Sequence, residues 1–236
     1  MEPLVLLPGL ICDQTVWQKQ MDALAGIAEC WVADYESLDT IPAMAEAVLR
    51  TGPDRFSVAG HSMGGRVALE IYRRAPERIQ RIALLNTGYL PLAEGAAGQE
   101  ETRKRAELVA LAQAQGMRAM LRQWLPPMID TRRRDDTVLV NAIVEMMSRK
   151  TPEIFAAQVR ALLGRPDAGP VLEQIRCPAL LLSGREDGWS TPAQHAAMSA
   201  RIGGSRLEIV PDSGHMSTME RPAEVSAALR AWLYTC

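Results

Sequence analysis

The sequence predicts an α/β domain with a mostly parallel β-sheet and helices on both of its faces. Six short apolar runs recur along the chain, at residues 4–7, 30–33, 56–59, 82–85, 179–182 and 207–210. None of these runs alternates apolar with polar residues, as expected for strands that are covered on both faces. Helical patterns separate the early runs, and this alternation predicts parallel strands joined by right-handed crossovers. Ligands of such sheets bind beyond the carboxyl ends of the strands.

Two helices are predicted from the spacing of their apolar residues. The first has apolar side chains one and two turns apart and a proline at a favoured first-turn position. Its stripe consists of Ile41, Met44, Ala45, Val48 and Leu49, and the proline is Pro42. The second begins near Pro222 and would close the fold. Its stripe consists of Val225, Leu229, Trp232 and Leu233.

Length and composition favour one large globular domain. The chain has 236 residues, of which 47% are hydrophobic and 23% charged, which argues against a disordered, collagen-like or coiled-coil protein. The formal charge of −2 provides no field that would attract nucleic acid or an anionic membrane. No apolar stretch approaches the ~18–20 residues that cross a bilayer, and no basic segment precedes the first run. We therefore expect a protein that neither spans a membrane nor is secreted, with a small-molecule partner.

Cysteine and histidine are too sparse for a metal or disulfide framework. The four cysteines, Cys12, Cys30, Cys177 and Cys236, lie far apart, and the chain has three histidines. Neither the paired spacing of a zinc site nor the density of a disulfide scaffold is present. The pattern favours a reducing compartment, and we expect a cytoplasmic protein.

The interval between the fourth and fifth apolar runs predicts a helical insertion. It is far too long for a simple connection between strands and must contain structure of its own. Helical segments are expected at residues 100–115, 117–124, 135–148 and 152–163. We expect residues 1–91 and 167–236 to form the core and residues 92–166 to form a cap, or lid, over the sheet.

Five methionines of the insertion are candidates for the roof of a pocket. They are Met117, Met120, Met128, Met146 and Met147. Flexible thioethers suit an adaptable apolar pocket, but the same side chains could equally pack the cap onto the body. Among the tryptophans, Trp124 and Trp189 are the better pocket candidates and Trp17 is a weaker one. Met128 and Met146 complete the predicted pocket.

Basic residues slightly outnumber acidic ones in the insertion. Residues 92–166 contain 12 Lys and Arg against 9 Asp and Glu, an excess that mildly favours an acidic substrate or an acidic carrier. Alternatively, these side chains simply cover the apolar surface of the cap. The run Arg132 to Arg134 is followed directly by Asp135 and Asp136, which favours a solvated loop over a phosphate or carrier-protein site.

The segment from Phe56 to Gly65 carries the strongest chemical signal. A strand pattern leads into Gly60-His61-Ser62-Met63-Gly64, and a helical pattern follows. This strand–turn–helix context is typical of a nucleophile elbow, which lifts a serine hydroxyl off the end of the sheet. So tight a turn leaves little room for side chains two residues before and after the serine. We interpret Ser62 as a nucleophile.

A serine hydroxyl needs a base to take its proton, and three histidines are available. His61 neighbours Ser62, so the backbone should aim its side chain away. His195 falls in a helical stretch and is expected at the surface. His215 follows the last strand in Asp212-Ser213-Gly214-His215, where it can reach the carboxyl edge of the sheet. We therefore interpret His215 as the base.

The base in turn needs a carboxylate that orients it and stabilises its charged form. Asp187 lies on a loop after the fifth strand, at the same edge of the sheet, and the chain order Ser62, Asp187, His215 is the one expected for this architecture. Glu186 and Asp212 are the alternatives.

Attack on a carbonyl creates an oxyanion that backbone N–H groups must stabilise. The N–H of Met63, directly after the nucleophile at the start of a helix, is one candidate donor. The N–H of Leu10, in the segment Leu7-Pro8-Gly9-Leu10 after the first strand, is the other. Pro8-Gly9 could instead form an ordinary turn.

These motifs together resemble the α/β-hydrolase superfamily over essentially the whole chain. The matching features are Pro8-Gly9-Leu10, Gly60-His61-Ser62-Met63-Gly64-Gly65, the helical insertion, Gly184-x-x-Asp187 and Gly214-His215. The chain is particularly similar to small single-domain esterases, enol-lactonases and acyl-carrier-protein methyl ester hydrolases. It departs from many members in having Pro8 where they have histidine, and in lacking an N-terminal hairpin. The resemblance therefore implies a sheet of about six strands.

The resemblance also limits the reaction. Haloalkane dehalogenases and soluble epoxide hydrolases of this superfamily carry aspartate at the elbow, whereas this chain has Ser62. We therefore expect hydrolysis of a carboxylic ester, thioester or lactone through an acyl-enzyme, with no metal or organic cofactor. The alternatives are acyl transfer to another acceptor, perhydrolysis, carbon–carbon bond hydrolysis and, from a different class, a slow-turnover ligand sensor.

Overall fold

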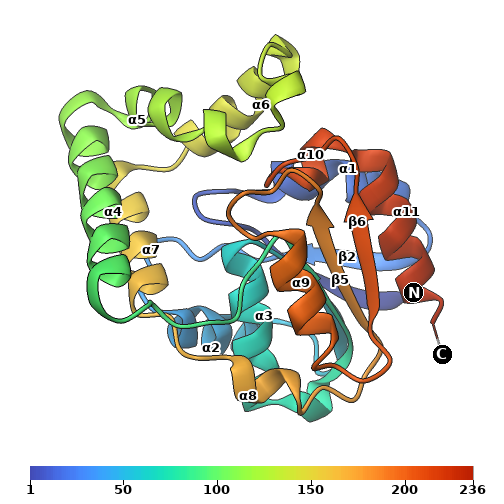
Figure 1. Ribbon diagram of the computed structural model, residues 1–236. Helices are drawn as coiled ribbons and strands as arrows, with labels where there is room; N and C mark the ends of the chain where they lie inside the picture. Colours follow the sequence, from blue (N-terminus) through green and yellow to red (C-terminus); the bar gives the residue numbers. More distant parts are fainter. Residues whose placement is uncertain (236) are drawn as a thin grey trace.

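The computed structural model describes residues 1–235 and contains a six-stranded parallel sheet (Figure 1). The strand order is β2-β1-β3-β4-β5-β6, and every neighbouring pair is parallel. The strands are β1 (Glu2–Leu7), β2 (Ala28–Val32), β3 (Phe56–His61), β4 (Ile79–Leu85), β5 (Ala179–Gly184) and β6 (Arg206–Val210). Each predicted apolar run overlaps one of these strands, so the predicted fold class and strand number are confirmed.

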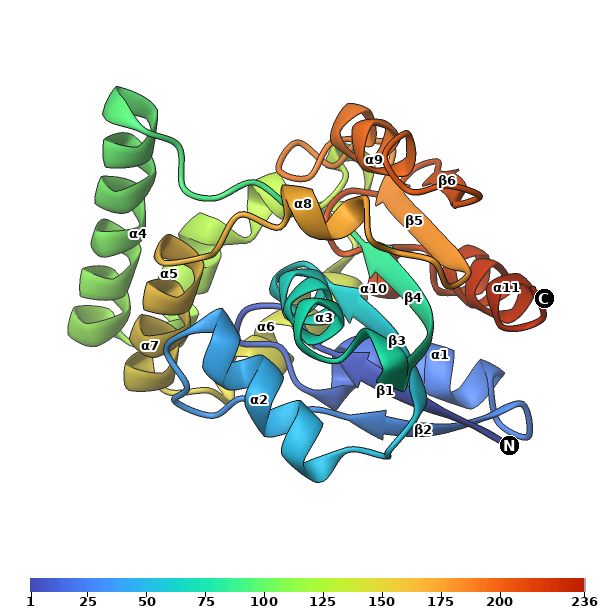
Figure 2. The same ribbon diagram turned by 90° about the horizontal axis from the view of Figure 1, so that it is seen from below.

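Helices cover both faces of the sheet. Figure 2 shows α2 and α3 on one side of the sheet and α1 and α11 on the other. The helices of this part of the fold are α1 (Gln18–Ala23), α2 (Ile41–Thr51), α3 (Met63–Arg74), α8 (Gly169–Leu172), α9 (Pro192–Ser199), α10 (Ser217–Glu220) and α11 (Pro222–Leu233), with 3-10 turns at Gln14–Trp17 and Pro76–Arg78. Both predicted amphipathic helices are present, as α2 and α11.

Local sequence explains how these helices begin. The hydroxyl of Thr40 accepts a hydrogen bond from the Ala43 N–H at 3.2 Å, and Pro42 lies in the first turn of α2. Helix α9 starts with a capping box, in which Thr191 and Gln194 satisfy each other's backbone N–H groups. Caps of this kind supply acceptors to N–H groups that a helix leaves without partners.

The core lies between the central strands and the two helical layers. All six residues of β3 and of β5 are buried, as the continuous apolar runs predict. The edge strands differ: β2 and β6 are only partly buried, and Leu207 on β6 is 36% exposed. Half-exposed edge strands do not require an unbroken apolar sequence, which explains the charged residues Glu29 and Glu208 within them.

Four long helices lie between β4 and β5. They are α4 (Gly95–Gln115), α5 (Met117–Trp124), α6 (Thr137–Ser148) and α7 (Pro152–Leu163), with 3-10 turns η3 (Pro126–Met128) and η4 (Thr131–Arg133). Figure 1 shows this group set apart from the sheet, with α5 and α6 on the side toward which β5 and β6 point. The sequence places helices at each of these positions; that the group acts as a cap stays a prediction.

The basic run of the insertion joins it to the core. The Arg132 guanidinium, which is 56% exposed, lies 2.6 Å from a carboxylate oxygen of Asp130 and 2.8 Å from one of Glu186, and it also pairs with Asp212. The loop is therefore solvated, as predicted, but Arg132 also connects the insertion to the loops after β5 and β6.

Cys12, Cys30 and Cys177 are free thiols, and Cys236 lies outside the described residues. Burial raises the pKa of the Cys177 thiol to about 11. No helix within residues 1–235 has the length and hydrophobicity that crossing a membrane would require. A cytoplasmic location stays a prediction.

Candidate active site

Ser62 occupies a strained turn between β3 and α3. Its backbone has φ 55° and ψ −117°, a conformation that residues other than glycine rarely adopt. The neighbouring strand holds this turn in place: the Ser62 N–H donates to the Leu85 carbonyl at 2.9 Å, and the Thr87 hydroxyl donates to the Ser62 carbonyl at 2.6 Å. The strain therefore aims the Ser62 side chain beyond the end of the sheet.

The glycines around Ser62 are required by close packing. A Cβ atom on Gly60 would lie 2.3 Å from the Gly64 carbonyl oxygen, and one on Gly64 would lie 2.1 Å from the Leu7 carbonyl oxygen. Both distances are well inside van der Waals contact with backbone atoms that cannot move aside. The elbow consequently excludes any side chain at these two positions, as the sequence predicts.

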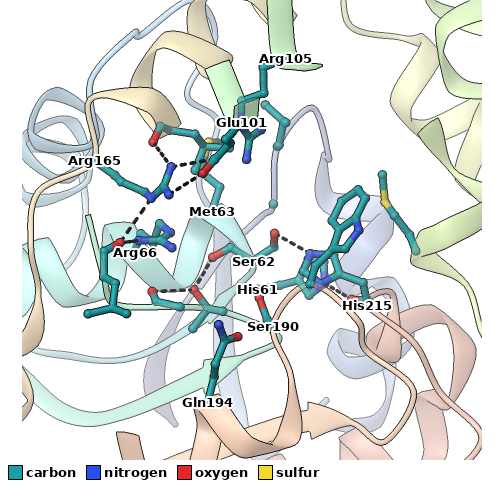
Figure 3. Close-up of a pocket in the computed structure, with 18 of the residues that line it drawn as sticks. His61, Ser62, Met63, Arg66, Glu101, Arg105, Arg165, Ser190, Gln194 and His215 are labelled. Atoms are coloured by element: carbon teal, nitrogen blue, oxygen red, sulfur yellow. Dashed lines mark hydrogen bonds and ion pairs between the residues drawn. The ribbon is translucent and has the colours of Figure 1, made fainter. Parts of the chain in front are cut away.

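His215 and Asp187 lie in line with the Ser62 hydroxyl. The Nε2 atom of His215 is 2.8 Å from Ser62 Oγ, and its Nδ1 atom is 2.9 Å from Asp187 Oδ2. Figure 3 shows His215 beside Ser62 at one side of the cavity. With Nδ1–H donating to the carboxylate, Nε2 is free to accept a proton, so this arrangement can activate a hydroxyl for attack on a carbonyl.

Asp187 is buried but remains favoured in its charged form. Burial alone would raise the pKa of its carboxyl, but His215 and hydrogen bonds from the Ser190 N–H and the Asn86 side chain lower that pKa below its usual value. The Trp189 and Ser190 N–H groups both donate to Oδ1 at 2.9 Å, and Asn86 donates to Oδ2 at 3.0 Å. A carboxylate held this rigidly can orient an imidazole.

The alternatives to Asp187 lie elsewhere. Glu186 and Asp212 both pair with Arg132, and Glu186 also accepts a hydrogen bond from the Ser213 N–H at 2.9 Å. Of the three candidate carboxylates, Asp187 is the one that the structure brings to His215.

Glu220 holds the loop that carries His215, a role that the sequence does not reveal. Its buried carboxylate accepts hydrogen bonds from the backbone N–H groups of Gly214 at 3.0 Å and Met216 at 3.1 Å, on either side of His215. The other oxygen accepts from the Asp130 N–H at 2.9 Å, in the insertion. Burial raises the pKa of Glu220, and these donors offset only part of that effect. No sequence motif marks a glutamate that accepts hydrogen bonds from two nearby backbone N–H groups and one distant one.

His195 lies in the core, and the prediction that it is at the surface was wrong. Its side chain is 0% exposed. Its Nδ1 atom lies 3.1 Å from the Thr191 carbonyl and its Nε2 atom accepts from the Thr87 N–H at 3.2 Å, so both ring nitrogens have partners. Helix α9 packs against β5 and β6 and turns His195 toward the sheet, which a short helical pattern alone does not specify.

His61 contacts the backbone of His215. Its Nε2 atom donates to the His215 carbonyl oxygen at 2.8 Å, and its ring packs edge-on against Trp17. Burial and the nearby His215 lower the pKa of His61 from 6.5 to about 4. His61 is therefore neutral at physiological pH, and its hydrogen bond supports the loop that carries His215.

We expect His61 to make the fold sensitive to acid. The unfolded chain binds a proton on His61 near pH 6.5, and the folded chain does so only near pH 4. The stabilisation that neutral His61 gives the fold is therefore complete above pH 6.5 and is lost as the pH falls toward 4. Between about pH 7 and about pH 5 this should lower the free energy of unfolding by about 2 kcal/mol. His61→Gln keeps a donor for the His215 carbonyl but has no proton to bind in this range. In urea titrations its free energy of unfolding should therefore fall less than that of the wild type between these two pH values.

The comparison between the two proteins isolates His61. Burial also lowers the pKa of His195, but that residue is present in both proteins, so its contribution to the acid sensitivity cancels. Equal losses of stability in the wild type and His61→Gln would contradict the assignment.

The segment after β1 approaches Ser62 closely. A Cβ atom on Gly9 would lie 3.2 Å from Ser62 Cβ and 3.0 Å from His61 Nδ1. The next residue, Leu10, borders the cavity together with Met63. The Leu10 N–H makes no hydrogen bond within residues 1–235.

Gln158 supports this segment from the insertion, and the sequence gives no sign of it. Its buried side chain accepts a hydrogen bond from the Ile11 N–H at 2.7 Å and donates to the Glu36 carbonyl at 3.1 Å. Ile11 has a positive φ of 52°. The loop next to Ser62 is therefore strained, and the Gln158 side chain holds it against the segment of Glu36.

A cavity of about 670 Å³ extends from Ser62 toward the insertion. Of the residues predicted to line it, Trp124, Trp189 and Met128 do so. The indole of Trp189 lies between the rings of His215 and Trp124, with ring centroids 5.3 Å and 5.6 Å away. These side chains form an apolar wall on the His215 side.

Several candidate pocket residues lie elsewhere, including Met117 and Met120, which are buried outside the cavity lining. Met146 is fully buried, and its neighbour Met147 lines the cavity instead. Successive helical residues point about 100° apart, so a one-residue error moves a side chain from a pocket wall into packing. Trp17 is also fully buried, in the core beneath His61.

The cluster of oxygen ligands that could hold a metal already contains a cation. Asp130, Glu186 and Asp212 offer carboxylate oxygens within 4.8 Å of one another. The Arg132 guanidinium pairs with all three. The cluster is therefore a salt-bridge network that joins the insertion to the core.

Comparisons with known proteins place the chain in a family of enzymes. A family model described as the alpha/beta hydrolase family matches residues 4–228. The chain is 26% identical to the pimeloyl-[acyl-carrier protein] methyl ester esterase of Nitrosomonas europaea, over 94% of this chain and 91% of that protein. It is also 26% identical to the (E)-2-((N-methylformamido)methylene)succinate hydrolase of Acinetobacter baylyi, over 99% of this chain and 91% of that protein.

Solved structures are similar as well. A thermophilic esterase from Thermogutta terrifontis, determined with malate bound, superimposes with a TM-score of 0.84 at 26% identity and covers 99% of this chain and 89% of its own. The resemblance inferred from the motifs is thus confirmed. With a matching family model over most of its length, this chain belongs to the alpha/beta hydrolase family and is an enzyme of that fold.

Proposed function

We propose that the protein is a serine hydrolase that cleaves a carboxylic ester, thioester or lactone through Ser62, His215 and Asp187. One observation carries this proposal: Ser62 Oγ is 2.8 Å from His215 Nε2, while His215 Nδ1 is 2.9 Å from a buried carboxylate oxygen of Asp187. A hydroxyl, an imidazole and a carboxylate in this order form the arrangement that activates serine for acyl transfer.

The first half of the reaction forms an acyl-enzyme. His215 Nε2 takes the proton of Ser62 as Oγ attacks the carbonyl carbon, and the carbonyl oxygen becomes an oxyanion. The N–H groups of Leu10 and Met63 are the proposed donors to that oxyanion. The intermediate collapses when the bond to the leaving oxygen or sulfur breaks and His215 returns the proton to that atom.

The second half repeats these steps with water. His215 takes a proton from a water molecule whose oxygen attacks the acyl carbon, and the second tetrahedral intermediate expels Ser62 Oγ, which recovers the proton. The products are the acid and the alcohol, thiol or ring-opened hydroxy acid. Every proton is carried by His215, so the cycle requires no metal or organic cofactor.

Two relatives support hydrolysis as the reaction. The two relatives described above are named as a methyl ester esterase and a hydrolase. The first acts on an acyl-carrier protein derivative, which makes a carrier-bound acyl group a candidate substrate here too. We further propose that residues 92–166 form a cap over residues 1–91 and 167–236, since Met128 and Trp124 line the cavity next to His215.

Trapping of the acyl-enzyme tests the proposal. Acid quenching of the wild type shortly after it is mixed with p-nitrophenyl acetate should give a protein one acetyl group heavier. Peptide mapping should place that group on Ser62, because Ser62 is the proposed covalent nucleophile. An acetyl group on any other residue would contradict the assignment of the nucleophile.

A further inference from the structure

The wall of the cavity opposite His215 carries a surplus of positive charge. Figure 3 shows Arg66 and Arg165 on the side of Ser62 that faces away from His215, and Glu101 and Arg105 above Met63. Four basic side chains border the cavity, those of Arg66, Lys104, Arg105 and Arg165, against the carboxylates of Glu100 and Glu101. This end of the cavity therefore differs in kind from the apolar wall that Trp124 and Trp189 form.

Internal ion pairs satisfy most of these charges. Glu101 pairs with both Arg165 and Arg105, at 2.8 Å and 2.9 Å. Glu100 lies 3.3 Å from Lys104 and also pairs with Arg103, outside the cavity wall. Both carboxylates are thus already shared between two cations each, and neither forms an ion pair with Arg66 within the described residues.

Arg66 is the cation without an acidic partner. Within residues 1–235 its guanidinium forms no ion pair; Nη1 donates to the Leu90 carbonyl oxygen at 2.8 Å. A guanidinium has five N–H donors, so most of its hydrogen-bonding capacity is unused. Burial and the neighbouring Arg165 lower the pKa of Arg66 to about 9. A partly buried cation next to other cations destabilises the fold unless an anion pairs with it.

The backbone around Arg66 leaves room for the guanidinium to face the cavity. A Cβ atom on Gly88 would lie 2.9 Å from Arg66 Nη2, so a side chain there would displace the guanidinium. Arg66 lies on α3 four residues after Ser62, and both residues line the same cavity. An anion bound by Arg66 would therefore belong to the same molecule that Ser62 attacks.

The position of His215 decides which part of that molecule carries the anion. The leaving oxygen must lie near His215 Nε2 to receive its proton, so the leaving group extends toward the His215 side. The acyl chain then extends toward the opposite side, where Arg66 lies (Figure 3).

We propose that Arg66 binds a carboxylate at the far end of the acyl chain. The substrates are then monoesters or monothioesters of dicarboxylic acids, or lactones that bear a free carboxylate. This inference rests on the proposed function and names the substrate class of the same site. Arg66 is then a specificity-determining residue whose cationic fork pairs with the free carboxylate, while Arg105 and Arg165 supply additional positive potential.

Esters matched in length test this specificity. The wild type should hydrolyse p-nitrophenyl hydrogen glutarate with a kcat/KM about 10-fold or more above that for p-nitrophenyl pentanoate. Arg66→Gln should lower kcat/KM for the glutarate ester by about 10- to 100-fold, the range expected for loss of a charged hydrogen-bonded pair, and change the value for the pentanoate ester by less than about 3-fold. Arg122→Gln, an exposed change of equal charge on α5, should leave both values unaltered.

Other outcomes would overturn the proposal in distinguishable ways. An equal loss with both esters would show that Arg66 supports the fold through Leu90 and does not select an anion. A loss confined to the acetate ester of 4-hydroxybenzoate, whose carboxylate lies on the leaving group, would reverse the assignment of the acyl side.

A binding measurement separates this inference from the proposed function. In the Ser62→Ala background, calorimetric titration with monomethyl glutarate needs no turnover. Adding Arg66→Gln should weaken that binding by about 10-fold or more, and unchanged binding would overturn the role of Arg66 even if hydrolysis proceeds through Ser62. Turnover that survives Ser62→Ala would instead overturn the proposed function and leave the carboxylate site standing.

Discussion

Replacement of Ser62 by alanine is expected to lower kcat for p-nitrophenyl acetate by about 10⁴- to 10⁶-fold. The substitution removes the oxygen atom that we propose forms the acyl-enzyme, and it leaves the cavity and the proposed N–H donors of Leu10 and Met63 in place. Those interactions alone retain a small residual rate over water. The measurement is kcat at saturating ester for both proteins.

The fold should survive this substitution. The turn at Ser62 is held by backbone groups, through hydrogen bonds to Leu85 and Thr87, and alanine removes only the hydroxyl. Thermal unfolding should therefore show that Ser62→Ala is as folded as the wild type. Ser148→Ala, at a half-buried serine on α6 that is not a cavity-lining residue, is the matched control and should leave kcat unchanged.

Replacement of Asp187 by asparagine is expected to lower kcat by about 10⁴-fold. The amide oxygen can still accept from the Trp189 and Ser190 N–H groups, so the loop keeps its shape. The amide nitrogen then faces His215 Nδ1, which must become the acceptor. The proton of the imidazole moves to Nε2, where it prevents His215 from accepting the proton of Ser62.

Asp212→Asn is the control for this experiment. Asp212 is a carboxylate of the same surface region that pairs with Arg132 and Arg221 and does not contact His215. Its replacement should change kcat by less than about 10-fold. A loss with Asp212→Asn equal to that with Asp187→Asn would show that the carboxylate has been assigned wrongly.

Local patterns predict the elements that depend on neighbours in sequence. The helical segments expected at residues 117–124 and 152–163 coincide with α5 and α7, because proline, glycine and apolar spacing mark both ends. The elbow is equally local, since the geometry of the turn itself imposes Gly60 and Gly64. The chain order of strands then brings Ser62, Asp187 and His215 to one edge of the sheet.

Features that depend on long-range packing could not be predicted. Whether His195 points to solvent or to Thr87 depends on how α9 lies on the sheet, and whether Met146 or Met147 faces the cavity depends on the rotation of α6. Glu220 accepts from the Asp130 N–H and Gln158 from the Ile11 N–H, each in a loop far away in the sequence. Neither contact leaves a sequence motif, because every residue except proline has a backbone N–H and the partner position therefore shows no preferred residue type.

The insertion and the site are physically coupled in a way that only the structure reveals. The His215 N–H donates to the Met128 carbonyl at 2.7 Å, and Glu220 links the His215 loop to Asp130. A Cβ atom on Gly214 would lie 2.4 Å from the Met128 carbonyl oxygen. Any displacement of this part of the insertion would therefore move the proposed base.

The most direct test of the central claim is the number of equivalents of p-nitrophenolate that the wild type and Ser62→Ala release from p-nitrophenyl acetate. We predict sustained release of many equivalents by the wild type and almost none by the variant, with acetate as the second product. Release of one equivalent that then stops would instead indicate an acyltransferase that lacks its acceptor, or a ligand sensor. Undiminished release by Ser62→Ala would contradict the account.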